Sequence, residues 1–119
     1  MKEMGLRHLA YLGDAVWELF VRERTVLQTS NAGVLHKITT EKVKAAFRAY
    51  LLDELETQLS EEEKEIARRG RNLPIPVGRR SNQAEYRLAT AFETLIGWWY
   101  YHDKNRLNNV LQILENFVK

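Results

Sequence analysis

Apolar residues recur through the first part of the chain at the spacing of an α-helix. Residues 9–21 are apolar or glycine except for Asp14 and Glu18. One helical face carries Leu6, Leu9, Ala10, Gly13, Val16, Trp17 and Phe20, and apolar residues fill much of the rest: Tyr11, Leu12, Ala15 and Leu19. A surface helix keeps one face polar. The pattern therefore predicts a helix that is central in the fold or is covered a second time by a partner subunit.

Helical spacing returns after residues 29–33 (TSNAG), which interrupt it. A second helix is predicted over residues 39–59 (TTEKVKAAFRAYLLDELETQL), with Thr39 or Thr40 as its N-cap because both side chains can accept a hydrogen bond from the first turn. Ser60 followed by three glutamates predicts a capping box. The helix that begins there is short, and we expect it to end near Gly70.

Residues 71–81 (RNLPIPVGRRS) are predicted to be non-helical, because Leu73 and Ile75 each precede a proline and are biased towards extended geometry. Asn82, with Glu85 three residues later, predicts the start of another helix. Its apolar stripe is Leu88, Phe92, Leu95, Ile96 and Trp99. A last helix, which Asp103 or Asn105 separates from it, has the stripe Leu107, Val110, Leu111, Leu114, Phe117 and Val118. No strand alternation occurs, so we expect a single all-α domain over residues 1–119.

Composition narrows the possible classes of protein. The chain has 119 residues, a formal net charge of +2 and no cysteine. The lack of cysteine excludes disulfides and thiolate metal sites and is consistent with a reducing compartment. Asp14 interrupts the N-terminal apolar run, so a signal peptide is not expected, and no stretch reaches the roughly 20 apolar residues of a membrane span. We expect a cytoplasmic protein without a membrane partner.

Positive charge is concentrated between residues 68 and 80. This segment holds Arg68, Arg69, Arg71, Arg79 and Arg80 and no acidic residue. Since prolines keep part of it extended, the segment can reach beyond the globule and contact a polyanion. An ordinary solvated, charged loop is the alternative.

Two acidic residues lie inside the most apolar helical stretches. Asp14 has Ala10 and Gly13 as neighbours on its helix, and Glu93 has small residues one turn away on either side: Ala89, Thr90 and Gly97. Small side chains let two helices approach closely, so both carboxylates can point into one pocket. Two neighbouring anions repel, and such a pocket needs a cation or raised pKa values. A hard divalent ion such as Mg²⁺ suits oxygen ligands; the alternative is pairing with an arginine such as Arg87 or Arg22.

The order of residues around these acids is specific. The stretch YLGDAVWE (11–18), followed much later by TAFETLIGWWYY (90–101), resembles the ribonuclease III catalytic domain. The resemblance implies that Asp14 and Glu93 are catalytic metal ligands for Mg²⁺-dependent hydrolysis of phosphodiester bonds in double-stranded RNA. It also implies a homodimer whose two-fold interface is the first helix, with Tyr11, Leu12 and Ala15 in the contact.

The chain departs from the usual family pattern at two positions. The typical enzyme has acidic residues where this chain has Ala10 and Thr90, so two of four carboxylates are missing. Such losses, the sequence RRGRN (68–72) and the lack of an appended double-stranded-RNA-binding domain resemble the Mini-ribonuclease III branch. That branch is catalytic and trims structured precursors of large-subunit (23S) ribosomal RNA. The five arginines suit contact with the phosphates and 2′-hydroxyls of duplex RNA. Glu18 and Thr90 are expected next to the ligands, and a solvated or arginine-paired Glu18 is the alternative.

Two alternatives stay open from the sequence alone. A catalytically silent ribonuclease III fold that binds structured RNA as a scaffold accounts for Ala10 and Thr90. A helical dimerisation module without any role in RNA metabolism is the other, and it predicts no salt-dependent affinity for RNA.

Overall fold

The computed structural model describes residues 5–76 and 82–119, and within them the fold is all-α, as predicted. The elements are α1 (Leu6–Thr25), α2 (Ala32–Val43), α3 (Ala45–Leu55), the 3₁₀ turn η1 (Glu56–Gln58), α4 (Glu61–Arg71), α5 (Gln83–His102) and α6 (Lys104–Val118). None of these helices combines the length and apolarity required to cross a bilayer.

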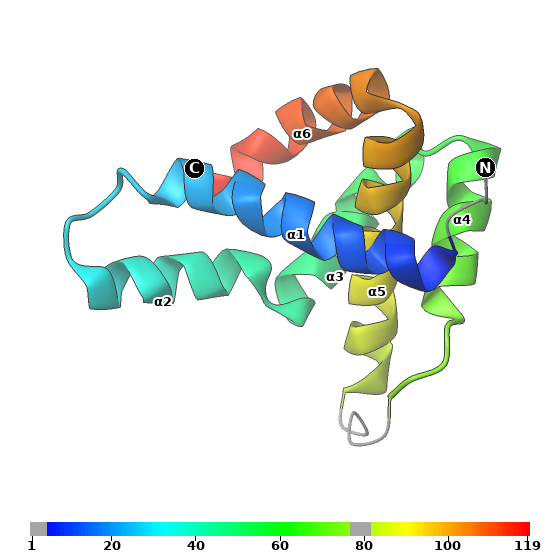
Figure 1. The fold of residues 1–119 in the computed structure, drawn as a ribbon, viewed down its shortest axis with the longest axis horizontal. Helices are drawn as coiled ribbons and strands as arrows, with labels where there is room; N and C mark the ends of the chain where they lie inside the picture. Colours follow the sequence, from blue (N-terminus) through cyan, green and yellow to red (C-terminus); the bar gives the residue numbers. More distant parts are fainter. Residues whose placement is uncertain (1–4, 77–81) are drawn as a thin grey trace.

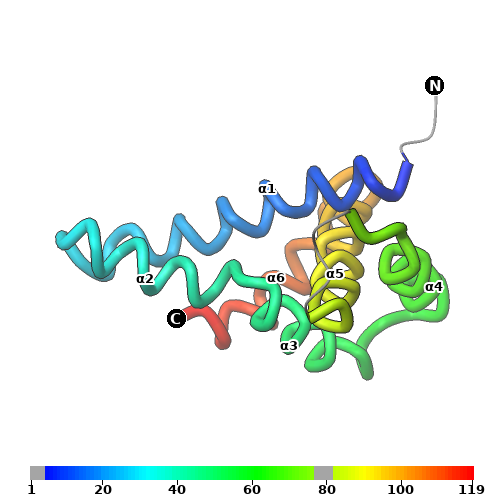
Figure 2. Tube along the Cα trace, turned by 90° about the horizontal axis from the view of Figure 1, so that it is seen from below, coloured from blue at the N-terminus to red at the C-terminus, as the bar shows by residue number. Residues whose placement is uncertain are grey.

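Helix α5 is the centre of the molecule. It packs against α1, α3 and α4, and α6 folds back beside it. Figure 1 shows α1 crossing α5, and Figure 2 shows α1 on one side of α5 with α3 on the other. Helices α1 and α2 form a hairpin that extends beyond the rest of the fold (Figure 1). The two most apolar segments of the sequence therefore lie against each other. This agrees with the prediction that a helix without a polar face is covered by other parts of the fold.

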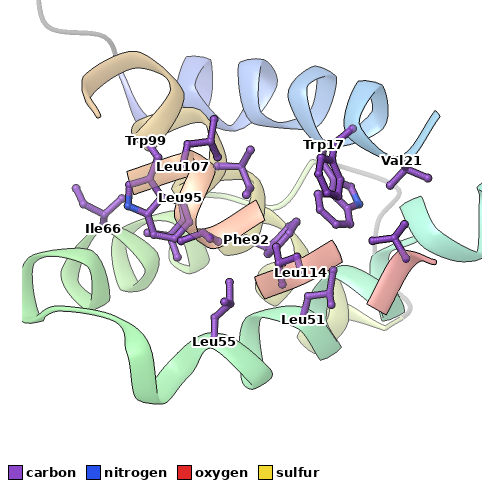
Figure 3. Packing of buried hydrophobic residues seen from close by; sticks show 14 residues of the cluster. Trp17, Val21, Leu51, Leu55, Ile66, Phe92, Leu95, Trp99, Leu107 and Leu114 are labelled. Atoms are coloured by element: carbon purple, nitrogen blue, oxygen red, sulfur yellow. The ribbon is translucent and has the colours of Figure 1, made fainter. Parts of the chain in front are cut away.

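The core fills the space between these helices (Figure 3). The indole of Trp17 stacks on Phe20 and meets the ring of Phe92 edge-on, with 5.1 Å between the centroids of Trp17 and Phe92. Every predicted stripe supplies part of this core. Its members include Leu51, Leu55, Leu95, Trp99, Leu107 and Leu114. The indole nitrogen of Trp17 donates to the carbonyl of Lys42 at 2.9 Å, so the ring also ties α1 to the end of α2.

Two glycines allow α1 and α5 to touch through their backbones. A Cβ atom on Gly13 would overlap the carbonyl oxygen of Glu93, and one on Gly97 would overlap the carbonyl oxygen of Leu9. Any larger residue at either position would force the helices apart. The prediction that small residues let the two acid-bearing helices approach closely is confirmed.

The second predicted helix is wrong in its boundaries. Helix α2 begins at Ala32 with Asn31 as its N-cap, whose side chain accepts from the backbone of Val34. Thr39 and Thr40, the predicted caps, lie well inside this helix. Lys44 then adopts extended geometry (ψ 159°) and separates α2 from α3. Asn31 caps the helix because its amide oxygen reaches the free amide groups of the first turn, the role that had been assigned to the threonines.

Predictions for the other helix starts had mixed outcomes. The capping box at Ser60 and Glu63 is confirmed, with both of its hydrogen bonds present. Asp103 caps α6 by accepting from the backbone of Arg106. The predicted helix start at Asn82 is confirmed, since α5 begins at the next residue, but Asn82 lies in the left-handed region (φ 55°) and its side chain makes no capping bond.

Glu63 has a second role that the sequence did not indicate. Its carboxylate is buried and accepts hydrogen bonds from the indole nitrogen of Trp99 and from the guanidinium of Arg106. Burial alone would raise the pKa of Glu63, but the bonds from Arg106, the Ser60 backbone and Trp99 outweigh it and lower the pKa to about 2. This carboxylate joins the start of α4 to α5 and α6.

Glu63 should make the protein sensitive to acid. Because its folded pKa of about 2 lies below the ordinary 4.5, the stabilisation is complete above pH 4.5 and is lost as the pH falls towards 2. The shift corresponds to about 3 kcal/mol. We expect Glu63→Gln to lower the free energy of unfolding at pH 7 by about 2–3 kcal/mol and to flatten its decline in acid, measured by urea denaturation from pH 7 to pH 3. The exposed Glu62→Gln is the control, and equal acid profiles for the three proteins would contradict this role.

Candidate functional site

Asp14 and Glu93 meet where α1 crosses α5, and Arg48 of α3 bridges them. The Nη1 atom of Arg48 lies 2.7 Å from Oδ1 of Asp14 and 3.0 Å from Oε2 of Glu93. Both carboxylate oxygens are therefore within 3.0 Å of one nitrogen and less than twice that distance apart. The contact between Gly13 and the backbone at Glu93 sets this proximity.

Arg48 is the arginine that pairs with the acids, in place of the candidates named from the sequence. Its side chain is 4% exposed, and its Nε donates to the carbonyl of Val43 at 2.7 Å. Arg22 is exposed, and Arg87 donates to the carbonyl of Arg71. Arg48 was not predicted as a site residue, although its position carried a signal: it lies three residues before Leu51 on the face of α3 that enters the core.

The two carboxylates differ in exposure. The Asp14 side chain is 50% exposed and that of Glu93 is 22% exposed. Although Asp14 belongs to a largely apolar helix, it is only half-buried, because it lies beside the α1–α5 contact at the edge of an open pocket of about 280 Å³. Acidic, basic and small apolar groups line the pocket: Asp14, Glu18, Val43, Ala45, Arg48, Tyr86, Ala89, Thr90 and Glu93.

Both expected solutions to the repulsion between two anions are present. Burial raises the pKa of Glu93 to about 7, and the negative charges of Asp14 and Glu18 add to the rise. Arg48 acts in the opposite direction through its charge and its hydrogen bond. Near neutral pH the site therefore exchanges a proton easily, and the guanidinium supplies the cation.

The donor set fits a hard divalent cation that keeps several waters. One oxygen of each carboxylate contacts Arg48, and the other, Oδ2 of Asp14 and Oε1 of Glu93, has no hydrogen-bond partner among residues 5–76 and 82–119. Two such oxygens beside an open pocket are the ligands that Mg²⁺ takes when water completes its shell. The described part of the chain contains no group of three or more histidines or acids that could hold a metal.

The residues predicted to flank the acids also line this pocket. Glu18 is one turn after Asp14 on α1, and its charge contributes to the raised pKa of Glu93. Thr90 is buried, and its hydroxyl donates to the carbonyl of Tyr86 at 2.9 Å rather than pointing to a carboxylate.

The basic segment is only partly covered by the structure. Arg68, Arg69 and Arg71 are exposed at the end of α4, whereas Arg79 and Arg80 lie outside the described residues. The charge of Arg68 is not free, because its guanidinium pairs with Glu65 one turn earlier at 2.7 Å. A segment without acids can still be neutralised by an acid on the preceding helical turn.

The face of α1 that points away from α5 is apolar and exposed. Tyr11 is 82% exposed and Leu19 is 60% exposed, and Ala15 lies exposed between them while Leu12 is half-buried. Because Tyr11, Ala15 and Leu19 are four residues apart, they form one stripe along the helix.

Three comparisons relate the chain to known proteins. A family model described as Ribonuclease III domain matches residues 7–104. The chain is 44% identical over 117 residues to Mini-ribonuclease 3 of Gloeobacter violaceus, covering 98% of this chain and 87% of that protein. It is 41% identical over 107 residues to Mini-ribonuclease 3 of Synechocystis, covering 90% and 75%. The solved structure of protein FN1578 from Fusobacterium nucleatum superposes with a TM-score of 0.82 at 31% identity, over 97% of this chain and 95% of that one.

Proposed function

Since the chain belongs to the ribonuclease III domain family and is an endoribonuclease, we propose that it hydrolyses double-stranded RNA with Mg²⁺ at the Asp14–Glu93 pair. Members of this family act on double-stranded RNA and are generally dependent on a divalent metal. The observation that carries the proposal is the convergence of two carboxylates from α1 and α5 on one open pocket.

Each residue of the pocket has a role in this proposal. Oδ2 of Asp14 and Oε1 of Glu93 would hold the cation, which when bound activates water and stabilises the charge that develops on the phosphate. Without the cation, Glu93 has a pKa of about 7 and exchanges a proton near neutral pH, so loss of that proton would accompany binding of the cation. Glu18 adds negative charge at the pocket wall, and Thr90 lines the wall with its hydroxyl bonded to the backbone of its own helix.

The RNA path that we propose follows the end of α4. An RNA duplex is bound through phosphates and 2′-hydroxyls rather than through base edges, and exposed arginines supply such contacts. Within the basic segment, Arg69 and Arg71 are the described residues with this character. Arg68 joins them when it leaves Glu65, and Arg79 and Arg80 belong to the same proposal. Resemblance to the Mini-ribonuclease III branch supports a structured precursor of 23S ribosomal RNA as the substrate, in the cytoplasm.

The exposed stripe of α1 supports a homodimer. A monomer seldom leaves a large aromatic and an aliphatic side chain exposed in line on its most apolar helix. Tyr11, Leu12 and Ala15 would pack against the same helix of a second copy, which gives the isologous contact of a two-fold dimer. Each copy then brings its own Asp14–Glu93 pair, one for each strand of a duplex.

Tyr11→Ala should weaken this dimer. Removing a large aromatic side chain from an interface costs about 2 kcal/mol or more, so we expect the dimer dissociation constant to rise roughly 30-fold or more. Sedimentation over a concentration series measures it. Tyr100→Ala is the matched control, because Tyr100 lies near the end of α5, where the ammonium group of Lys104 lies over its ring. An unchanged dissociation constant for Tyr11→Ala would place the interface elsewhere.

Removal of metal tests the proposed activity directly. We expect purified protein to cut a duplex RNA in the presence of Mg²⁺, and EDTA to abolish the cleavage while added Mg²⁺ restores it. Single-stranded RNA of the same sequence is the control and should survive. Binding of the duplex without cleavage at any Mg²⁺ concentration would favour the catalytically silent scaffold. That alternative rests on Ala10 and Thr90, which stand where the typical enzyme of the family has acidic residues.

A further inference from the structure

The pocket contains a cation that belongs to the chain itself. Arg48 is 3% exposed and is fixed by three contacts: the Val43 carbonyl at 2.7 Å, Asp14 at 2.7 Å and Glu93 at 3.0 Å. Its buried guanidinium contacts one oxygen of each carboxylate, Oδ1 of Asp14 and Oε2 of Glu93. The second oxygen of each carboxylate makes no hydrogen bond with residues 5–76 and 82–119, and both acids line the open pocket.

This arrangement affects the affinity of the pair for a divalent cation. A metal bound to the outer oxygens would lie only a few ångströms from a guanidinium, and like charges at such separations in a partly buried site repel strongly. When both acids are ionised, Arg48 also cancels one of their two negative charges. A phosphodiester group of RNA brings another negative charge to the pocket, and this charge raises the affinity of the pocket for the metal.

We propose that Arg48 is a positioning residue that acts as the resident cation of the site. It keeps Asp14 and Glu93 together when no metal is bound, and it makes tight metal binding depend on the RNA phosphate. The inference rests on the proposed function and adds a regulation of the same site: metal and RNA bind cooperatively, because each supplies charge that the other needs.

The test measures Mn²⁺ binding to the protein without RNA. Electron paramagnetic resonance counts free Mn²⁺ at one fixed pH for the parent, Arg48→Gln and Arg48→Lys. We expect Arg48→Gln to bind Mn²⁺ about tenfold more tightly or better, since the repelling charge is gone. Arg48→Lys keeps the charge and should stay within about threefold of the parent. Asp14→Asn in each background identifies the binding that belongs to this pair.

The outcomes separate the inference from the proposed function. A structural defect would weaken metal binding, so equal or weaker Mn²⁺ affinity in Arg48→Gln overturns the role of Arg48 while Mg²⁺-dependent cleavage by the parent still supports the function. If no Mn²⁺ binding sensitive to Asp14→Asn is found in the parent or in Arg48→Gln, the inference falls together with the assignment of the metal to this pair.

A measurement on the parent protein does not depend on the folding of a variant. We expect Mn²⁺ to bind about tenfold more tightly or better in the presence of a nuclease-resistant, 2′-O-methylated duplex than in its absence. The same factor should relate the affinities for the duplex with and without Mn²⁺, since such coupling is reciprocal. Equal Mn²⁺ affinity with and without the duplex would overturn the proposal.

Discussion

Asp14→Asn is expected to reduce duplex cleavage by about a thousandfold or more, which corresponds to a loss of roughly 4 kcal/mol of transition-state stabilisation. Asparagine keeps the size of the side chain and an oxygen that accepts from Arg48, but it removes the charge that would hold a divalent cation. The turnover of a labelled duplex in Mg²⁺, compared with the parent at equal concentration, measures the loss.

The same variant should stay folded. Asp14 is half-exposed, and its negative charge contributes to the raised pKa of Glu93. Its removal should therefore move the pKa of Glu93 down from about 7, which NMR titration of the side chain detects. Asp53→Asn is the matched control, because Asp53 is an exposed acid on α3 that does not line the pocket. Cleavage by Asp14→Asn near the parent rate would refute the assignment of this carboxylate to the reaction.

Gly97→Ala is expected to destabilise the fold by about 3 kcal/mol or more. The added Cβ would overlap the carbonyl oxygen of Leu9 and approach the amide nitrogen of Gly13 at 3.0 Å. Since both neighbours are helix backbone, the helices can relieve the overlap only by moving apart. That movement also separates Asp14 from Glu93, so cleavage should be lost in any fraction that still folds. Urea denaturation followed by circular dichroism gives the change in stability.

Gly33→Ala is the control for helix propensity. Gly33 is exposed in α2, and a Cβ there would meet only the side chain of Asn31, at 3.3 Å. Alanine is a better helix former than glycine by up to about 1 kcal/mol, so this variant should be as stable as the parent or slightly more so. If Gly97→Ala and Gly33→Ala unfold at the same urea concentration, α1 and α5 do not touch at Gly97 in solution.

Local patterns in the sequence determined most of the helices. The 3.6-residue period of apolar positions and the capping box at Ser60 depend only on residues within a few turns of one another. The same holds for the prolines after Gly70, which end the helical pattern in the described residues. The break at Lys44 was missed because nothing in the neighbouring residues forbids helix there; the chain turns so that α2 can pack on α1 while α3 packs on α5.

The sequence by itself also predicted that Asp14 and Glu93 can share one pocket, since each acid is flanked by small residues in a largely apolar helix, but it left pairing with an arginine as an alternative. Only the tertiary structure decided which side chain from another helix contacts these two acids. Arg48 is 34 residues from Asp14, and Glu63 is 36 residues from its partner Trp99. Spacing along one helix cannot reveal which side chain from a distant helix enters a contact. That choice depends on how three helices pack together, because a buried charge stays only where packing brings an opposite charge within hydrogen-bond distance.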